Sequence, residues 1–337
     1  MIDLINKLRV AGDLEKEELT ELLRYRNQEL MEYICNEACE VREMSGKSVV
    51  KVFGRIPVSS YCKYDCKYCG LRRGNRFAAR YRMEEEQFLQ YCEEGYTQGI
   101  RDFLLESGDD AFFSGERITS YLQSAKEQFP DAYFSLALGE KNTQDYKNWL
   151  EAGAESYFLR CGTVNEQQFK KIHSNNMSLL IRKQHLWNLK EAGYRVGTGF
   201  LVGMPYQLID SVVEEIQFIK KFAPPIITMG AFVPSARTPF GSERSGNGEM
   251  TLYIMAILRL MLPDTEILAE ETLECVLRDG RMAALEAGAD AVLTTIADEE
   301  IKQAYRPYDW KNGRMHLPMD EWEHLLQKIQ EKGYSYT

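Results

Sequence analysis

The stretch Leu179–Val202 reads LLIRKQHLWNLKEAGYRVGTGFLV and shows how this chain is built. Leu179–Ala192 has the apolar spacing of a helix, and Arg195–Val202 is a short apolar run that is typical of a buried strand. Gly193 stands between them, where the end of a helix favours a residue with a positive φ. The stretch therefore predicts a helix, a glycine turn and a strand in succession.

The same succession recurs along the chain. The Glu-Ala-Gly pattern that ends at Gly193 occurs again in Glu151-Ala152-Gly153-Ala154 and in Glu286-Ala287-Gly288-Ala289. Strands are predicted at Arg55–Ser60, Asp102–Ser107, Ala132–Leu138, Ser156–Arg160, Arg195–Val202, Ile226–Val233, Glu266–Ala269 and Ala291–Thr295. Helices are predicted at Met83–Gln98, Ser114–Gln128, Gln144–Ala152, Leu179–Ala192, Ile209–Phe222, Glu249–Leu262 and Arg281–Ala287. This alternation favours an α/β fold, a complete (β/α)8 barrel of the TIM type, over a doubly wound open sheet.

Helical segments flank the predicted barrel. Residues 1–50 form an expected N-terminal helical extension, with a capped start at 13–18 and a longer helix at Arg24–Arg42, and it should cover one end of the barrel. Residues 51–300 form the barrel, and residues 301–337 form a tail whose closing helix is predicted at Asp320–Lys332. Cys35 and Cys39 share one face of the longer helix, and we expect them to pack in the core.

Composition and charge limit the function classes. The 337 residues are 44% apolar, which is enough for a large core, and no apolar run is long enough to span a bilayer. Acidic side chains outnumber basic ones by 51 to 41, which argues against a protein that binds nucleic acid or an anionic membrane. With no signal peptide evident, the eight cysteines are expected to be reduced in the cytoplasm.

Three cysteines follow the first predicted strand in the pattern Cys62-x3-Cys66-x2-Cys69. An all-cysteine iron–sulfur cluster normally takes four thiolates, so three would leave one iron open to a small molecule. A structural zinc site is the alternative, but it needs four ligands and usually takes them as two pairs. A disulfide and a chance group of buried thiols are the remaining alternatives.

Two other segments are expected near these cysteines. In a barrel the active site lies at the carboxyl ends of the strands, and the second strand runs into the polar turn 106–110. A glycine in that turn permits close approach of backbone to a ligand, and its carbonyls and carboxylates suit a cationic amine. The basic stretch from Arg72 to Arg82 is either a solvated loop or a loop that closes over a negatively charged cluster and cofactor.

The cysteine motif resembles the signature of a known superfamily. Tyr61–Cys69, with an aromatic residue before the last cysteine, resembles radical S-adenosylmethionine enzymes. The longer stretch Cys66–Asn75, followed by Arg80-Tyr81-Arg82-Met83, is similar to the HydE family, which matures [FeFe]-hydrogenase. That family shares a subgroup with biotin synthase and methylornithine synthase. The resemblance extends from about Gly54 to Thr295.

The resemblance implies cofactors and roles for individual residues. The cofactors are a [4Fe–4S] cluster and S-adenosylmethionine, whose amino and carboxylate groups bind the open iron, and cleavage yields a 5′-deoxyadenosyl radical. Either arginine named below could instead form a structural ion pair. The implied residues are Cys62, Cys66 and Cys69 as cluster ligands, Tyr68 beside the adenine, Ser107-Gly108-Asp109 for the methionyl amine, Arg182 near the methionyl carboxylate, and Arg160 in the cavity.

The chain departs from the HydE pattern around the expected substrate site. Cys161-Gly162-Thr163 stands where HydE has His-Glu-Thr, and Glu270–Cys275 replaces a small, Thr-rich segment. Leu293–Ile296 replaces a turn that contains Asn and Pro, and the C-terminal cysteines of an accessory cluster are absent from the sequence. Cys161 and Cys275 both follow strands, so they are candidate catalytic residues, as metal ligands, radical relays or thiol donors; the alternative is that they are small apolar fillers.

The sequence thus predicts an oxygen-sensitive, cytoplasmic radical S-adenosylmethionine enzyme, with hydrogenase cofactor maturation as its leading role. Radical rearrangement or cleavage of an amino-acid-like substrate, as in methylornithine synthase, is the alternative reaction. An electron-transfer or scaffold protein without chemistry is the alternative class, although pure electron carriers usually have four cluster ligands. The expected partners are a small molecule or small iron complex as substrate, an electron donor such as ferredoxin or flavodoxin, and other maturation proteins.

Overall fold

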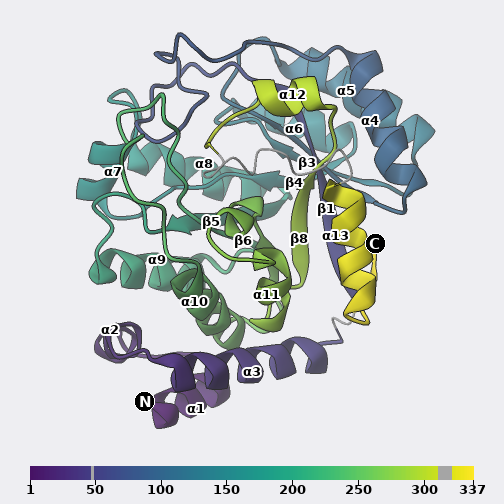
Figure 1. Cartoon of the computed structure of the whole chain (residues 1–337). Coiled ribbons are helices and arrows are strands. Elements are labelled where there is room, and N and C mark those ends of the chain that lie inside the picture. Colours follow the sequence, from purple (N-terminus) through teal and green to yellow (C-terminus); the bar gives the residue numbers. More distant parts are fainter. Residues whose placement is uncertain (47–48, 310–320) are drawn as a thin grey trace.

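Eight parallel strands surrounded by helices make up the centre of the computed structural model, which describes residues 1–46, 49–309 and 321–337 (Figure 1). The strands are hydrogen-bonded in the order β2 to β8 and then β1, and pairing of β1 with β2 closes the ring. The predicted barrel is therefore confirmed, and the open sheet is excluded. The strands are β1 (Val49–Ser59), β2 (Asp102–Ser107), β3 (Tyr133–Ala137), β4 (Ala154–Phe158), β5 (Arg195–Val202), β6 (Ile226–Ala231), β7 (Glu266–Ala269) and β8 (Ala291–Thr295).

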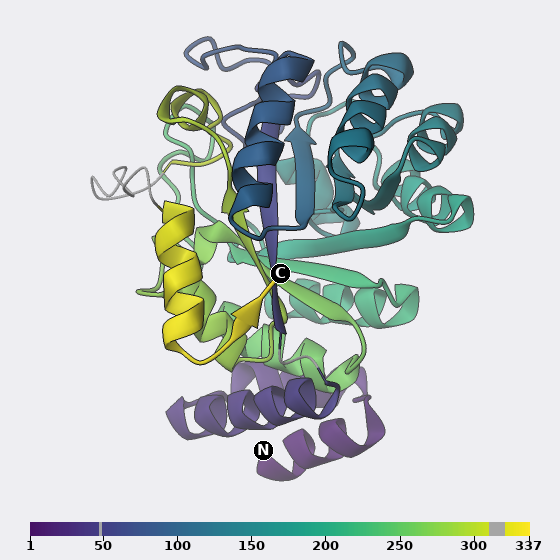
Figure 2. The same cartoon turned by 90° about the vertical axis from the view of Figure 1, so that its right-hand side faces the viewer.

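Helices follow the strands and cover the outside of the barrel (Figures 1 and 2). Gly153, Gly193 and Gly288 have φ angles of 109°, 105° and 94°, which confirms the predicted turns between helix and strand. The helices are α4 (Glu85–Thr97), α5 (Gly115–Gln128), α6 (Thr143–Glu151), α7 (Glu166–Ile172), α8 (Leu179–Ala192), α9 (Ile209–Phe222), α10 (Gly248–Met261), the 3-10 turn η1 (Glu271–Cys275), α11 (Gly280–Glu286) and α12 (Glu299–Ala304).

Three N-terminal helices, α1 (Ile2–Ala11), α2 (Lys16–Arg24) and α3 (Gln28–Met44), lie across the end of the barrel where the strands begin (Figure 1). They pack on α9, α10 and α11. The capped start is confirmed, because Glu15 and Glu18 form a reciprocal capping box. The predicted helix start at Arg24 is wrong: α2 ends there, and Asn27 caps α3 by accepting the N–H of Leu30 at 2.9 Å.

The C-terminal segment returns to β1. Helix α13 (Glu321–Glu331) forms within the predicted range, whose first residue lies outside the described residues. It is followed by β9 (Ser335–Tyr336), which pairs with Val49 and Val50. The sequence predicted neither this pairing nor the first half of β1, because both depend on residues distant in the chain. None of the helices in the described residues combines the length and hydrophobicity needed to cross a membrane.

An apolar layer closes the barrel interior below the carboxyl ends of the strands. Phe53 and Phe158 meet edge to face with ring centroids 5.8 Å apart, and Leu104, Leu268 and Leu293 pack with them. Side chains nearer the strand ends face a space above this layer. The layer therefore forms the floor on which a ligand site is built.

Arg259 on α10 provides a test of the barrel's outer packing. Its buried guanidinium donates to the carbonyls of Gly288 and Thr265 at 2.8 Å each and pairs with Asp290. We expect Arg259→Met to lower the free energy of unfolding by about 3–5 kcal/mol, because the substitution removes the cation of a buried ion pair. Denaturant titration measures this loss. Arg278→Met is the control, since its side chain is 93% exposed, and an equal effect of both substitutions would contradict the expectation.

Candidate active site

A cavity of about 230 Å³ opens above the apolar floor, at the carboxyl ends of the strands. Residues from the loop after β1 form one wall, and residues that follow β2, β4 and β7 form the others. All the residues that the sequence assigned to the cluster and the cofactor line this cavity: Cys62, Cys66, Cys69, Tyr68, Ser107, Gly108, Asp109, Arg160 and Arg182.

Backbone N–H groups point at each of the three thiols. Cys62 accepts hydrogen bonds from Tyr64 and from the N–H of Asp109, the latter at 3.4 Å. Cys66 accepts one from Ser174, and Cys69 accepts one from Leu71. Burial is the largest influence and raises the pKa of all three thiols, that of Cys66 to about 11, while these N–H donors lower it. The cysteine loop and two neighbouring segments thus supply hydrogen bonds that favour three thiolates in a partly buried site.

The donor set fits an iron–sulfur cluster. Three thiols face one cavity, and hydrogen bonds to the sulfurs are a normal feature of cluster sites. Within residues 1–46, 49–309 and 321–337, no group of three or more His, Cys, Asp or Glu side chains is arranged to hold a metal ion. Soft thiolates are the usual ligands of the irons in such clusters.

Arg80 clamps both ends of the cysteine loop. Its guanidinium donates to the carbonyl of Ser60, before the loop, and to the carbonyls of Leu71 and Arg72, after it, at 2.9 and 2.7 Å. Arg82 pairs with Asp110 at 2.8 Å. These two arginines of the basic stretch are therefore structural groups of the loop and not solvated charges.

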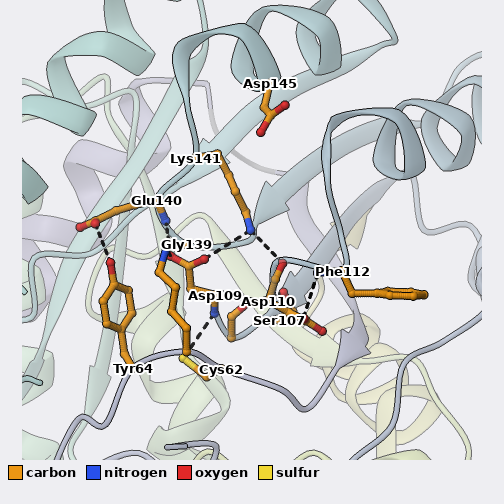
Figure 3. A network of polar contacts seen from close by, with 12 residues as sticks. Cys62, Tyr64, Ser107, Asp109, Asp110, Phe112, Gly139, Glu140, Lys141 and Asp145 are labelled. Atoms are coloured by element: carbon orange, nitrogen blue, oxygen red, sulfur yellow. Dashed lines mark hydrogen bonds and ion pairs between the residues drawn. The ribbon is translucent and has the colours of Figure 1, made fainter. Parts of the chain in front are cut away.

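Asp109 joins the loops that follow β1, β2 and β3, as Figure 3 shows. Its carboxylate lies 3.0 Å from the Lys63 ammonium and 3.4 Å from that of Lys141, and it accepts the N–H of Glu140 at 3.1 Å. The carboxylate is thus already surrounded by cationic and N–H groups. An amine at this turn would meet mainly the backbone of Ser107 and Gly108.

Gly108 brings this turn against the cysteine loop. A Cβ at this position would lie 2.3 Å from the carbonyl oxygen of Tyr61 and 2.5 Å from the Cβ of Cys62. Since such distances are impossible, the contact requires glycine.

Both predicted arginines lie in the cavity, and both have acidic partners. Arg182 pairs with Glu140 at 2.7 Å and donates to the carbonyl of Arg160 at 3.2 Å. Glu140 also accepts the hydroxyl of Tyr64 at 3.0 Å. Arg160 lies beyond the end of β4 and reaches Glu270, beyond β7, at 2.8 Å. The two ion pairs hold charged groups of both signs against the space where a ligand would lie.

A second charged group lies deeper and was missed by sequence reasoning. Arg55 on β1 is 6% exposed, pairs with Glu271 and lies 3.6 Å from Glu106. Tyr308 donates to Glu271 at 3.3 Å, and Tyr305 hydrogen-bonds to Glu106. Burial raises the pKa of Glu106, whereas Arg55 lowers it. The signal that could have identified Arg55 is a charged residue at the start of the apolar run predicted as the first strand.

The partly buried Tyr68 and the buried His173 form a pair at the cavity wall. The Tyr68 hydroxyl lies 3.4 Å from Nε2 of His173, and the imidazole stacks on Phe169 at 4.0 Å between centroids. Burial, with a contribution from Arg182, lowers the pKa of His173 to about 3, so the ring is neutral. The sequence predicted Tyr68 at this site but gave no reason to select His173.

Two buried hydroxyl groups in the cavity lack a partner. Thr228 on β6 and Thr272 in η1 are 3% and 2% exposed, and no described residue hydrogen-bonds to either side-chain oxygen. Both residues line the cavity. Buried hydroxyls are normally satisfied, so these two are free to hydrogen-bond to a ligand in the cavity.

Cys161 and Cys275 are not among the residues that line the cavity. Cys161 is 2% exposed, and burial raises its pKa to about 12. Cys275 ends η1 and is partly buried. Their suggested roles as metal ligands, radical relays or thiol donors stay predictions.

Comparison with known proteins adds independent evidence. The family model described as Radical SAM superfamily matches residues 56–219. The [FeFe] hydrogenase maturase subunit HydE of Thermotoga maritima is 31% identical over 92% of this chain and 88% of its own length. A 3-methylornithine synthase of Methanosarcina acetivorans is 26% identical over 90% of this chain and 85% of its own. The crystal structure of methylornithine synthase (PylB) superposes with a TM-score of 0.86 at 23% identity, over 99% and 97% of the two chains.

The Arg80 clamp predicts the behaviour of one conservative variant. Lys has a single ammonium in place of the planar fork, so Arg80→Lys cannot hold the carbonyls on both sides of the cysteine loop. Each charge-assisted bond lost costs about 1.5–3 kcal/mol of loop order. We expect the variant to retain less iron and sulfide after anaerobic reconstitution. Arg101→Lys is the matched control, because Arg101 also donates to backbone carbonyls but lies outside this loop, and equal iron retention in both variants would contradict the clamp.

Proposed function

Because this chain belongs to the radical SAM superfamily, whose members use a [4Fe–4S] cluster and S-adenosylmethionine, we propose that Cys62, Cys66 and Cys69 are the ligands of its cluster. The observation that carries the proposal is the set of three thiols in one cavity, each with a backbone N–H donor. A fourth thiolate is not needed, because the open iron binds the cofactor.

Other cavity residues then bind different groups of S-adenosylmethionine. The carbonyls of Ser107 and Gly108 receive the methionyl amine, Arg182 lies near the methionyl carboxylate, and Tyr68 packs beside the adenine. Bound together, the two cofactors would supply one-electron reductive cleavage of the bond between sulfur and C5′, with methionine and a 5′-deoxyadenosyl radical as the products. The protein's own contribution is to orient these groups and to hold the substrate next to that carbon.

Residues 305–309 cover one side of the proposed cofactor site. The N–H of Gly70, next to Cys69, donates to the carbonyl of Pro307 at 2.8 Å, and the N–H of Asp309 donates to the carbonyl of Pro234 at 3.2 Å. Residues 305–309 therefore lie against both the cysteine loop and the loop after β6. Such a cover keeps water away from a reactive radical.

We propose a HydE-like role in maturation of the [FeFe]-hydrogenase cofactor as the leading specific function, with a small iron complex as substrate and other maturation proteins as partners. Its support is the similarity to HydE over nearly the whole of both chains. The test is in-vitro activation of apo-[FeFe]-hydrogenase with this protein in place of HydE. Hydrogen evolution supports the role, whereas none from a protein that cleaves S-adenosylmethionine rejects it.

A second candidate, radical rearrangement or cleavage of an amino-acid-like substrate, is favoured by the cavity itself. Arg160 and Glu270 offer a cation and an anion at 2.8 Å from each other, and Thr228 and Thr272 offer unpartnered hydroxyls. A zwitterion carries the complementary carboxylate and ammonium. Glu270 and Thr272 belong to the segment where this chain departs from the HydE pattern.

The cluster assignment predicts that substitutions of different cysteines have different effects on cluster content and on product formation. We expect Cys62→Ala, Cys66→Ala and Cys69→Ala each to lose the cluster absorption and to form no 5′-deoxyadenosine with dithionite and S-adenosylmethionine, because no other thiol lines the cavity. Cys161→Ala and Cys275→Ala should keep both signals. Product formation by any of the first three variants would contradict the assignment, and loss of product in either of the last two, with iron retained, would place that thiol in the active site.

The amino-acid reaction predicts isotope transfer and a role for Glu270. With uniformly deuterated amino acids, the substrate should pass deuterium into 5′-deoxyadenosine. Glu270→Gln removes the negative charge beside Arg160, and we expect KM for that amino acid to rise roughly 10- to 100-fold, corresponding to about 1.5–3 kcal/mol for a charge-assisted bond. Glu274→Gln is the control, since Glu274 pairs with Arg281 outside the cavity lining. No deuterium transfer from any amino acid would reject this candidate.

A further inference from the structure

Positive charge is concentrated beside the cysteine loop of an otherwise acidic chain. Residues 61–82 carry seven basic side chains and one acidic side chain, although the whole chain has 41 basic and 51 acidic ones. Part of this charge is neutralised, because Lys63 pairs with Asp109, Arg72 with Asp65 and Arg82 with Asp110. The basic side chains that have no acidic partner would face a protein that binds here.

Three of the arginines in this region stay exposed and without acidic partners among the described residues. Arg73 and Arg76 lie in the loop after β1, and Arg237 lies in the loop after β6. The Arg237 guanidinium stacks over the ring of Phe77 at 4.5 Å, and Phe77 is itself 75% exposed. We call Arg73, Arg76, Phe77 and Arg237 the basic rim. An exposed aromatic ring framed by arginines has the composition of a protein interface core.

The basic rim is joined directly to the backbone that carries the cysteines. The N–H of Arg73 donates to the carbonyl of Tyr64 at 2.8 Å, between Cys62 and Cys66 in the sequence. The N–H of Gly74 donates to the Asp65 carboxylate at 3.0 Å. This loop lies at the end of the barrel opposite to the N-terminal helices (Figure 1). A protein seated on the rim would therefore lie against the outer side of the loop whose inner side faces the cavity.

We infer that the basic rim is the docking surface for an acidic protein electron carrier. The inference rests on the proposed function, because the cluster must receive one electron for each cleavage of S-adenosylmethionine. In that step the carrier is oxidised by one electron and the cluster is reduced by one electron, with no proton or bond exchanged. Negative charge on the carrier complements the rim, and because the whole chain has a net charge of −10 despite this basic segment, its other faces repel the carrier.

The test is charge reversal at the rim, with a reduced acidic flavodoxin as the carrier. Arg73→Glu/Arg76→Glu should slow flavodoxin-driven formation of 5′-deoxyadenosine at low salt by roughly 10-fold or more, because rim charges act on the association rate. The rate driven by dithionite should not change. Calorimetry should show weaker binding of oxidised flavodoxin to the variant, a readout that needs no turnover. The parent rate should fall as salt increases, and the variant rate should depend on salt much less.

Lys16→Glu/Arg24→Glu is the matched control, because it changes net charge equally at the opposite end of the barrel and should leave flavodoxin binding unchanged. Three results would overturn the inference. The first is equal slowing of the flavodoxin-driven rate by both double variants. The others are an equal loss of rate with dithionite and with flavodoxin in the rim variant, or weaker binding of S-adenosylmethionine to that variant. Failure of the parent to form 5′-deoxyadenosine with dithionite would instead reject the proposed function, while the calorimetry still decides whether the rim binds the carrier.

Discussion

The mutual repulsion of three cysteine sulfurs in one partly buried cavity is the constraint on which the rest of the site depends. Cys62 and Cys66 each raise the pKa of Cys69, after the larger effect of burial. Backbone N–H donors offset this cost, and they come from the cysteine loop itself, from the turn after β2 and from Ser174. The loops must therefore be fixed relative to one another, which explains why Arg80 and Asp109 are surrounded by hydrogen bonds and ion pairs.

Local signals predicted most of the fold. The bounds of β2, β5, β7 and β8 follow from short apolar runs, and Gly193 marks the turn between α8 and β5 because it adopts a positive φ. Long-range contacts explain the errors. The first half of β1 is a strand because β8 and β9 pair with it, and the break between α2 and α3 depends on capping by Asn27, within a segment otherwise suited to one helix.

The candidate site was predictable where a residue's type and its place after a strand suffice, as for the cysteines and Gly108, whereas Arg182, within α8, was assigned only by the family resemblance. The partners of the site residues were not predictable, because an ion pair such as that of Arg182, on α8, with Glu140, in the loop after β3, joins segments that meet only in the closed barrel. The same holds for Tyr305 and Tyr308, whose segment reaches the cavity from beyond the last barrel strand. Sequence patterns identify chemical groups, whereas the barrel closure determines which groups face each other.

Charge balance inside the cavity limits what can bind there. Arg55 lies with Glu106 and Glu271, Arg160 with Glu270, and Arg182 with Glu140. Removing one partner of a buried pair costs about 3–5 kcal/mol, so a ligand must either leave these pairs intact or supply the charge that it displaces. A ligand with both signs inserts between a cation and its anion and satisfies each. The cavity is therefore better suited to a zwitterion, or to a neutral complex with separated polar groups, than to a simple anion.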